Sequence, residues 1–253
     1  MIPLQGHCLC EDDYSDETPS NSRWGDVFFT WSASIQYRRA IHVYLYKPLM
    51  QTQFAPDGWK YAILTFVAGV LASIITPLAA VFGIIFSTSI LAFYRDPDRQ
   101  IAPIGVASPA DGTVSVVRDE GGQLRIGVYM SATNVHVNRA PLTGRVNEIT
   151  HRPGAYKLAF SKESENNEQL QIDFEDYSVI LIAGWFARRI HPYIEEGDRI
   201  SKGDRIGHIS FGSRADVILP PRFTEEDLAV EVGDTVYAGQ TMLAFDPDEE
   251  ECE

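Results

Sequence analysis

The chain offers a carboxylate, an imidazole and a hydroxyl in three short polar motifs. Asp111 lies in Ser-Pro-Ala-Asp-Gly, His136 in Asn-Val-His-Val-Asn-Arg, and Ser213 in Phe-Gly-Ser-Arg. An imidazole that takes the proton of a serine hydroxyl, and is itself oriented by a carboxylate, makes that hydroxyl a nucleophile. A structural interpretation is also open, because Asp-Gly and Gly-Ser pairs are common turn material. The motifs therefore indicate an enzyme only if the fold brings them together.

The part of the chain that would position these residues has the pattern of short strands. After Arg95, runs of β-branched residues are interrupted by Gly, Pro and Asp. That spacing predicts many strands and few helices. The clearest runs are 112–117, 124–129, 144–149 and 178–183. We therefore expect a mainly β (α+β) fold in which residues 95–253 form a sandwich-like or barrel-like catalytic domain.

Two segments near the C-terminal end share one pattern. Residues 196–209 and 232–245 each contain Gly-Asp, a later Gly and then a strand-like run. This resembles the turn-and-strand units of the small barrels that carry biotin or lipoate. Carrier function needs a lysine at a hairpin tip, and Lys202, the last lysine of the chain, lacks the flanking residues of a carrier. We expect the barrel-like architecture without that function.

A long apolar segment precedes the strand-rich part. The 34 residues from Tyr61 to Tyr94 carry no charge, and basic residues flank them on both sides. One straight helix would measure roughly 50 Å, well beyond a hydrocarbon core of about 30 Å. Thr76-Pro77 near the middle favours two helices, about 61–76 and 78–94, because proline ends or kinks a helix. We expect a transmembrane hairpin with both basic flanks in the cytoplasm; two buried core helices are the alternative.

The N-terminal residues have a different character. Residues 1–30 are polar and acidic, which predicts a disordered tail. Residues 31–58 interleave aromatic with basic side chains, a composition that suits the lipid headgroup layer. A helix packed against the following domain is an equally open interpretation of this second segment.

The composition of the chain limits the binding partners and the cellular compartment that we expect. The chain has 253 residues and a formal net charge of −14, which opposes nucleic-acid binding because phosphate contacts need clustered basic residues. The acid excess, with 16 Arg against 5 Lys, indicates adaptation to high salt, where charge repulsion is screened. Cys8, Cys10 and Cys252 form neither a disulfide framework nor a zinc site, so we expect a reducing interior and no metal.

Five motifs follow one another along the chain: Phe93-Tyr-Arg-Asp-Pro97, Ser108-Pro-Ala-Asp-Gly112, Val135-His-Val-Asn-Arg-Ala-Pro141, Ile182-Ala-Gly-Trp-Phe-Ala-Arg-Arg-Ile190 and Gly207-His-Ile-Ser-Phe-Gly-Ser-Arg-Ala-Asp-Val217. Taken in this order, they resemble one known family, the short archaeal and bacterial type of phosphatidylserine decarboxylase. The similarity runs from about residue 60 to 246 and includes the apolar segment.

The resemblance implies a proenzyme that makes its own cofactor. The Ser213 hydroxyl would attack the carbonyl of Gly212, and elimination would leave a β chain (1–212) associated with an α chain (213–253) that begins with a pyruvoyl group. Gly212 suits this step, because a residue without a Cβ allows a strained turn and a close approach. His136 would be the base, oriented by Asp111.

The resemblance also implies the reaction. The pyruvoyl carbonyl derived from Ser213 would condense with the amine of phosphatidylserine or archaetidylserine to form an imine, and the adjacent carbonyl would accept the electrons released as CO₂ leaves, giving the ethanolamine lipid. A protonated His136 would return the proton. The apolar segment and its basic flanks predict a location at the cell membrane with the catalytic domain on the cytoplasmic side, and the resemblance implies association into a homodimer.

One position departs from the long-form relatives, which carry two histidines three residues apart. Here the second position is Arg139. Either His136 serves both cleavage and decarboxylation, or Arg139 binds the carboxylate or phosphate of the substrate. His151, His191 and His208 are expected to be structural. The alternative from another class is a membrane-anchored serine hydrolase that uses Asp111, His136 and an uncleaved Ser213.

Overall fold

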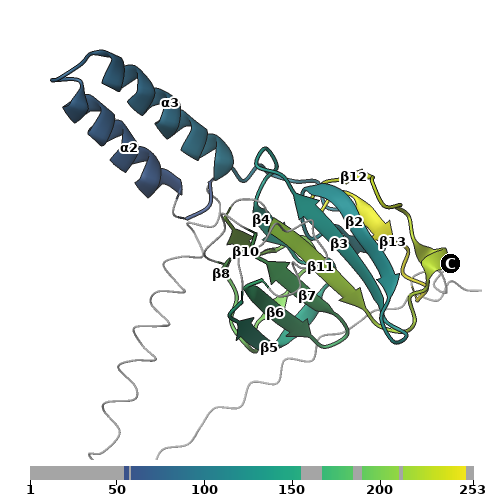
Figure 1. Cartoon of the computed structure of the whole chain (residues 1–253). Coiled ribbons are helices and arrows are strands. Elements are labelled where there is room, and N and C mark those ends of the chain that lie inside the picture. Colours follow the sequence, from purple (N-terminus) through teal and green to yellow (C-terminus); the bar gives the residue numbers. More distant parts are fainter. Residues whose placement is uncertain (1–53, 57, 155–166, 185–189, 211–212, 249–253) are drawn as a thin grey trace, which may run out of the picture. The chain divides into compact units, whose positions relative to one another are not determined.

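The protein is described by a computed structural model, shown in Figure 1. Its described residues are 54–56, 58–154, 167–184, 190–210 and 213–248. The chain divides into two compact units, Met1–Pro48 and Leu49–Glu253, and all described residues belong to the second. The predicted acidic tail (1–30) and almost all of the predicted interfacial segment (31–58) therefore lie outside the described residues.

The apolar segment forms a hairpin of two helices, α2 (Gly58–Ala72) and α3 (Leu78–Phe93), as the sequence predicted. The break falls where proline was expected, because Pro77, with a φ of −58°, stands at the N-cap of α3. The helices approach closely: a β-carbon on Gly83 would lie only 2.7 Å from the α-carbon of Gly69. Small residues thus form the seam between the helices.

The structure does not support the transmembrane part of that prediction. No helix within the described residues is long and apolar enough to cross a membrane. The helices have 15 and 16 residues. At 1.5 Å per residue each reaches only about 22 to 24 Å, against a hydrocarbon core of about 30 Å.

The strand-rich prediction is confirmed. The main sheet has eight antiparallel strands in the order β12-β2-β3-β11-β7-β6-β5-β9. The strands are β2 (Gly112–Asp119), β3 (Leu124–Met130), β5 (Gly144–Arg152), β6 (Gln169–Phe174), β7 (Ser178–Ile182), β9 (Arg199–Ile200), β11 (Ser213–Leu219) and β12 (Thr235–Val236). The central strand β11 pairs with β3 on one side and β7 on the other.

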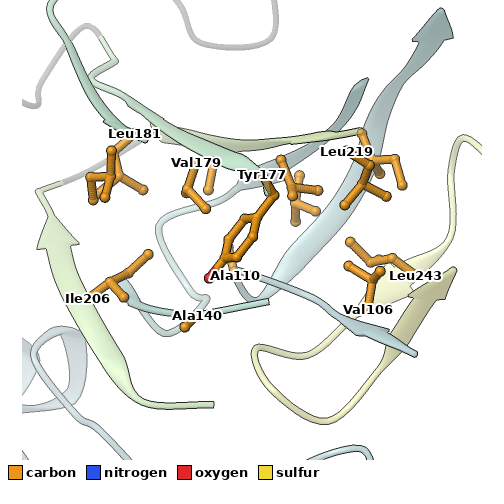
Figure 2. Packing of buried hydrophobic residues seen from close by; sticks show 14 of the residues in the cluster. Val106, Ala110, Ala140, Tyr177, Val179, Leu181, Ile206, Leu219 and Leu243 are labelled. Carbon is orange, nitrogen blue, oxygen red and sulfur yellow. The ribbon is translucent and has the colours of Figure 1, made fainter. Parts of the chain in front are cut away.

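Two smaller antiparallel sheets complete the domain, with strand orders β4-β10-β8 and β1-β13. Their strands, with one short 3₁₀ helix, are β1 (Val106–Ala107), β4 (Val137–Arg139), β8 (Ile190–Pro192), β10 (Arg205–Ile209), β13 (Met242–Ala244) and η3 (Glu225–Asp227). Figure 2 shows Leu181 and Leu219 of the main sheet facing Ile206 and Leu243 of the smaller sheets, so the core lies between these layers. This layered arrangement agrees with the predicted sandwich-like domain.

The repeated Gly-Asp pattern appears twice in the structure as strand, turn, strand. The first copy contains β9 and β10, joined through Gly203 with a φ of +86°, and the second contains β12 and β13, joined through Gly239 with a φ of +73°. Both values lie in the left-handed region that glycine adopts without steric cost. In each copy the first strand, β9 or β12, lies at an edge of the main sheet, whereas the second strand, β10 or β13, belongs to one of the two smaller sheets; β10 leads towards the candidate site.

Candidate active site

Ser213 is the first residue of β11 and lies in the interior of the domain. Its backbone pairs with Met130 on β3, and its exposed fraction is 0%. The hydroxyl contacts the Met130 sulfur at 3.9 Å, and a thioether is only a weak acceptor. Among the described residues, the hydroxyl is therefore buried without a strong hydrogen bond to hold it. Gly212, the predicted cleavage partner, lies outside the described residues.

His136 lies just before β4 and is also buried. Its Nδ1 is 2.9 Å from the carbonyl oxygen of Asn134. Because a carbonyl can only accept, Nδ1 carries the hydrogen and Nε2 keeps a lone pair. Burial lowers the pKa of His136 to about 4; the Asn134 hydrogen bond opposes this shift, and the charge of Arg95 adds to it. The ring is therefore a neutral base at pH 7.

Asp111 has other partners than the predicted one. One carboxylate oxygen accepts from Arg99 Nη2 at 2.8 Å and the other from the backbone N–H of Ala238 at 2.8 Å. Among the described residues, no contact joins Asp111 to His136; the Asn134 carbonyl orients the imidazole instead. Sequence reasoning missed Arg99, because a single arginine in a loop between Asp and Gln gives no sign of its distant partner.

Arg139 is held by a buried ion pair. Its Nη2 lies 2.9 Å from Asp96, and its Nη1 donates to the Gly203 carbonyl at 3.0 Å. Arg205 pairs with the other oxygen of Asp96, so one carboxylate faces two guanidinium groups. Burial lowers the pKa of Arg139, and Asp96 opposes this. In this arrangement Arg139 anchors β4, and its role as a ligand of the substrate stays a prediction.

Asn138, which sequence reasoning did not single out, contacts the same neighbour as Ser213. Its side chain is completely buried on β4. Nδ2 lies 3.4 Å from the Pro109 carbonyl oxygen and 3.7 Å from the Met130 sulfur. Asn138 and Ser213 therefore contact the same sulfur atom from two different strands. The only available signal was its position between His136 and Arg139 in a motif already of interest.

The hairpin ends at the candidate site. The Phe93 ring, at the end of α3, lies 4.3 Å from the His136 ring between centroids. Arg95 donates to the Thr133 carbonyl at 2.7 Å, and Asp96 follows at once with its two arginines. The motif Phe93-Tyr-Arg-Asp-Pro97 thus connects the exposed helices to the catalytic candidates.

The remaining histidines of interest are packed or on the surface. His208 on β10 stacks on His191 at 4.6 Å and contacts the Tyr193 hydroxyl through Nδ1 at 2.8 Å. His151 is half exposed and lies 2.9 Å from Glu168. These contacts hold the three rings on partners other than Ser213.

Comparison with known proteins places this site in a family. The family described as phosphatidylserine decarboxylase matches residues 86–244. A Halobacterium salinarum protein named archaetidylserine decarboxylase proenzyme is 52% identical over 190 residues, which cover 75% of this chain and 97% of the relative. A Streptomyces griseus phosphatidylserine decarboxylase proenzyme is 47% identical over 165 residues, 63% of this chain and 75% of the relative. The chain belongs to the phosphatidylserine decarboxylase family, as its motifs predicted.

Proposed function

We propose that the chain is a self-processing decarboxylase. It cleaves itself between Gly212 and Ser213 and then removes CO₂ from the serine headgroup shared by phosphatidylserine and archaetidylserine. The relatives named as proenzymes support the processing step.

The burial of Ser213 carries the proposal. A serine hydrolase must present its hydroxyl to an external ester, whereas the Ser213 side chain has an exposed fraction of 0%. A buried hydroxyl can still react with the peptide bond that precedes it. The described state therefore favours a proenzyme over the serine-hydrolase alternative.

The sheet explains how the two chains stay together after cleavage. The new α chain would begin with β11, which is paired along its length with β3 and β7 of the β chain. β12 and β13 of the α chain pair with β2 and β1 of the β chain. A cut before Ser213 breaks none of these ladders. Association of the processed chains into a homodimer stays a prediction.

The residues around position 213 fit a pyruvoyl group formed there. Such a group would supply one carbonyl that condenses with an amine and an adjacent carbonyl that accepts the electrons released with CO₂. In the uncleaved chain this place is lined by Met130 and Asn138 and is closed to bulk water, and the lipid amine reaches it only after cleavage. The fully buried Asn138 offers a polar group without adding a charge.

His136 supplies the base. Its neutral ring has a lone pair on Nε2, which can take the hydroxyl proton of Ser213 and deliver it to the departing nitrogen of the cleaved bond. With a pKa of about 4 the ring holds a proton weakly, so a proton received in one step passes on readily in the next. This property suits one imidazole that serves both cleavage and decarboxylation.

The hairpin supports a location at the cytoplasmic face of the membrane. Sixteen large apolar or aromatic side chains between Trp59 and Phe86 are exposed, with Ile74 at 83% and Ile75 at 85%. A contiguous apolar surface of this kind indicates a partner that is itself apolar. We propose that the hairpin inserts into one leaflet without crossing the bilayer, which brings the site to the lipid headgroups.

Denaturing mass spectrometry of the purified chain tests the processing step. We expect two fragments, 1–212 and 213–253, the second with a blocked N-terminus. Ser213→Ala abolishes the cut, whereas the matched variant Ser210→Ala, three residues upstream, is processed normally. An intact chain near 28.3 kDa as the only species would contradict the proposal, as would cleavage of Ser213→Ala.

A further inference from the structure

We propose that the side-chain oxygen of Asn138 binds the amino group of the substrate at position 213. This inference rests on the proposed function and names a residue that takes part in it. Asn138 is 0% exposed, and within the part of the chain that the structure describes its Oδ1 has no hydrogen-bond partner. Buried acceptors are nearly always paired, so this exception calls for a donor that arrives later.

The orientation of the amide follows from its neighbours. Nδ2 lies 3.4 Å from the carbonyl oxygen of Pro109. If the amide were flipped, Oδ1 would face that oxygen, and two acceptors would meet without a hydrogen. Oδ1 is therefore the end of the side chain that stays available.

The position of the amide relative to Ser213 is set by Met130. Nδ2 of Asn138 lies 3.7 Å from the Met130 sulfur, and Oγ of Ser213 lies 3.9 Å from the same atom. Asn138 sits on β4 and Ser213 on β11, so two sheets bring them to one sulfur. A substrate bound at position 213 therefore lies near the Asn138 amide.

The chemistry at position 213 determines which donor arrives. An acceptor that lacks a partner binds an N–H or O–H group, and the substrate must bring its amine to this carbon. In the condensation the ammonium loses three hydrogens: two leave with the carbonyl oxygen as water, and one is released as a proton. The nitrogen lone pair forms the first bond to carbon, and the electron pair of an N–H bond that loses its proton forms the second as the oxygen leaves in water. While the nitrogen still carries hydrogens, Oδ1 can accept one and hold the lone pair towards the carbonyl.

A neutral acceptor suits this step better than a carboxylate would. A carboxylate beside the amine favours the charged ammonium and raises its pKa, whereas the attacking form is the free amine. An amide oxygen directs the N–H bond with a smaller effect on that pKa. Asn138 is therefore expected to orient the amine without keeping it protonated.

The test uses Asn138→Leu, which keeps the approximate size and removes the acceptor. The purified, processed protein is incubated with phosphatidylethanolamine vesicles and cyanoborohydride, and mass spectrometry follows the gain in mass of fragment 213–253. Cyanoborohydride reduces the imine between the lipid amine and position 213 and so traps the amine on this fragment. We expect this trapping to be about tenfold slower in Asn138→Leu than in the parent, the typical effect of one lost hydrogen bond. Asn138→Asp, which keeps an acceptor, recovers part of the rate.

Two further measurements separate this role from a structural one. Asn138→Leu is still cleaved between Gly212 and Ser213, and it melts no lower than the parent: it removes a buried unpaired oxygen, and the Pro109 carbonyl that loses the long contact with Nδ2 keeps its 2.9 Å hydrogen bond from the Arg139 backbone N–H. The matched variant Asn167→Leu melts lower, because the buried Asn167 amide donates to the Ala183 carbonyl at 2.8 Å.

The possible failures are distinct. Trapping at the parental rate in Asn138→Leu would overturn the inference while leaving the proposed function intact. Loss of cleavage in Asn138→Leu would also overturn it, since Oδ1 would then serve the Ser213 hydroxyl in the precursor. A parent protein that is neither cleaved nor trapped would overturn the proposed function itself.

Discussion

The hairpin and the strand domain use apolar side chains in opposite ways. In the strand domain, large aliphatic residues such as Ile126, Leu181 and Ile209 are completely buried. In the hairpin, Ile74 and Ile75 are more than 80% exposed, while the buried positions belong mostly to glycine and alanine. Both regions are rich in apolar residues, so composition alone does not distinguish them.

This difference shows what each region needs from its surroundings. The strand domain satisfies its apolar side chains internally, between the sheets. The hairpin packs only a narrow seam and presents its large side chains outwards, which an apolar environment such as a lipid leaflet would stabilise. The short motif from Phe93 to Asp96 joins the two regions and contacts both His136 and Arg139.

Asp96→Asn should give the largest effect, because it tests how firmly the junction is held in the strand domain. Removing the charge leaves Arg139 and Arg205 facing each other in a buried site, and breaking such a pair costs about 3–5 kcal/mol. Urea unfolding measures this loss. Asp248→Asn is the control, since Asp248 pairs with Arg222 on the surface and should change stability by less than about 1 kcal/mol. Equal losses would show that the junction is not an anchor.

Ile75→Arg tests the opposite behaviour of the hairpin. A guanidinium placed in the apolar part of a leaflet costs up to about 2.5 kcal/mol, so binding to anionic vesicles should fall by as much as about 60-fold. Val232→Arg, at an exposed apolar position of the strand domain, should leave vesicle flotation unchanged. If both variants float like the parent, the exposed hairpin surface does not insert into lipid.

The free energy of unfolding should depend on acid pH through the candidate site and not through the hairpin. The helices of the hairpin contain no titratable group other than Lys60 and Tyr61. The pKa of about 4 for folded His136 lies below the ordinary 6.5, so the unfolded chain binds this proton more readily. Stability from this residue is complete above pH 6.5 and falls as the pH drops towards 4, by about 2 kcal/mol between pH 7 and 5. The slope is measured by urea unfolding at each pH. His136→Gln should remove that part of the slope, and an unchanged slope would refute the assignment.

Local patterns predicted the elements of the fold well. The β-branched runs at 112–117 and 178–183 became β2 and β7, and Pro77 marked the turn of the hairpin. The order of the strands could not be read in the same way, because β11 pairs with β3, more than 80 residues earlier. The local pattern of a strand states which face is buried but not which distant strand is its neighbour.

The candidate site was predicted in part for the same reason. The motifs identified the correct family, and the roles of Ser213 and His136 stay predictions. The contact of Asp111 with His136 was not found, because the long-range partner Arg99 holds that carboxylate. Asn138 was missed because its importance depends on an unpaired oxygen and on the shared contact with Met130, and neither is visible before the strands are placed together.

Gly83→Ala should have the smallest effect, and it tests the seam that holds the hairpin together. The added β-carbon would lie 2.7 Å from the Gly69 α-carbon, and since both atoms belong to backbone, the helices must move apart. Overpacking of this kind costs about 1–3 kcal/mol, whereas alanine in a helix gains about 1 kcal/mol over glycine. The net loss should be about 1 kcal/mol, seen as roughly fivefold faster hydrogen exchange in α2 and α3. Ser89→Ala, whose hydroxyl bonds within α3 to the Ile85 carbonyl, is the control and should exchange at the parental rate. Slower exchange in Gly83→Ala would mean that helix propensity outweighs the seam, and the hairpin would then hold together without close packing of its backbones.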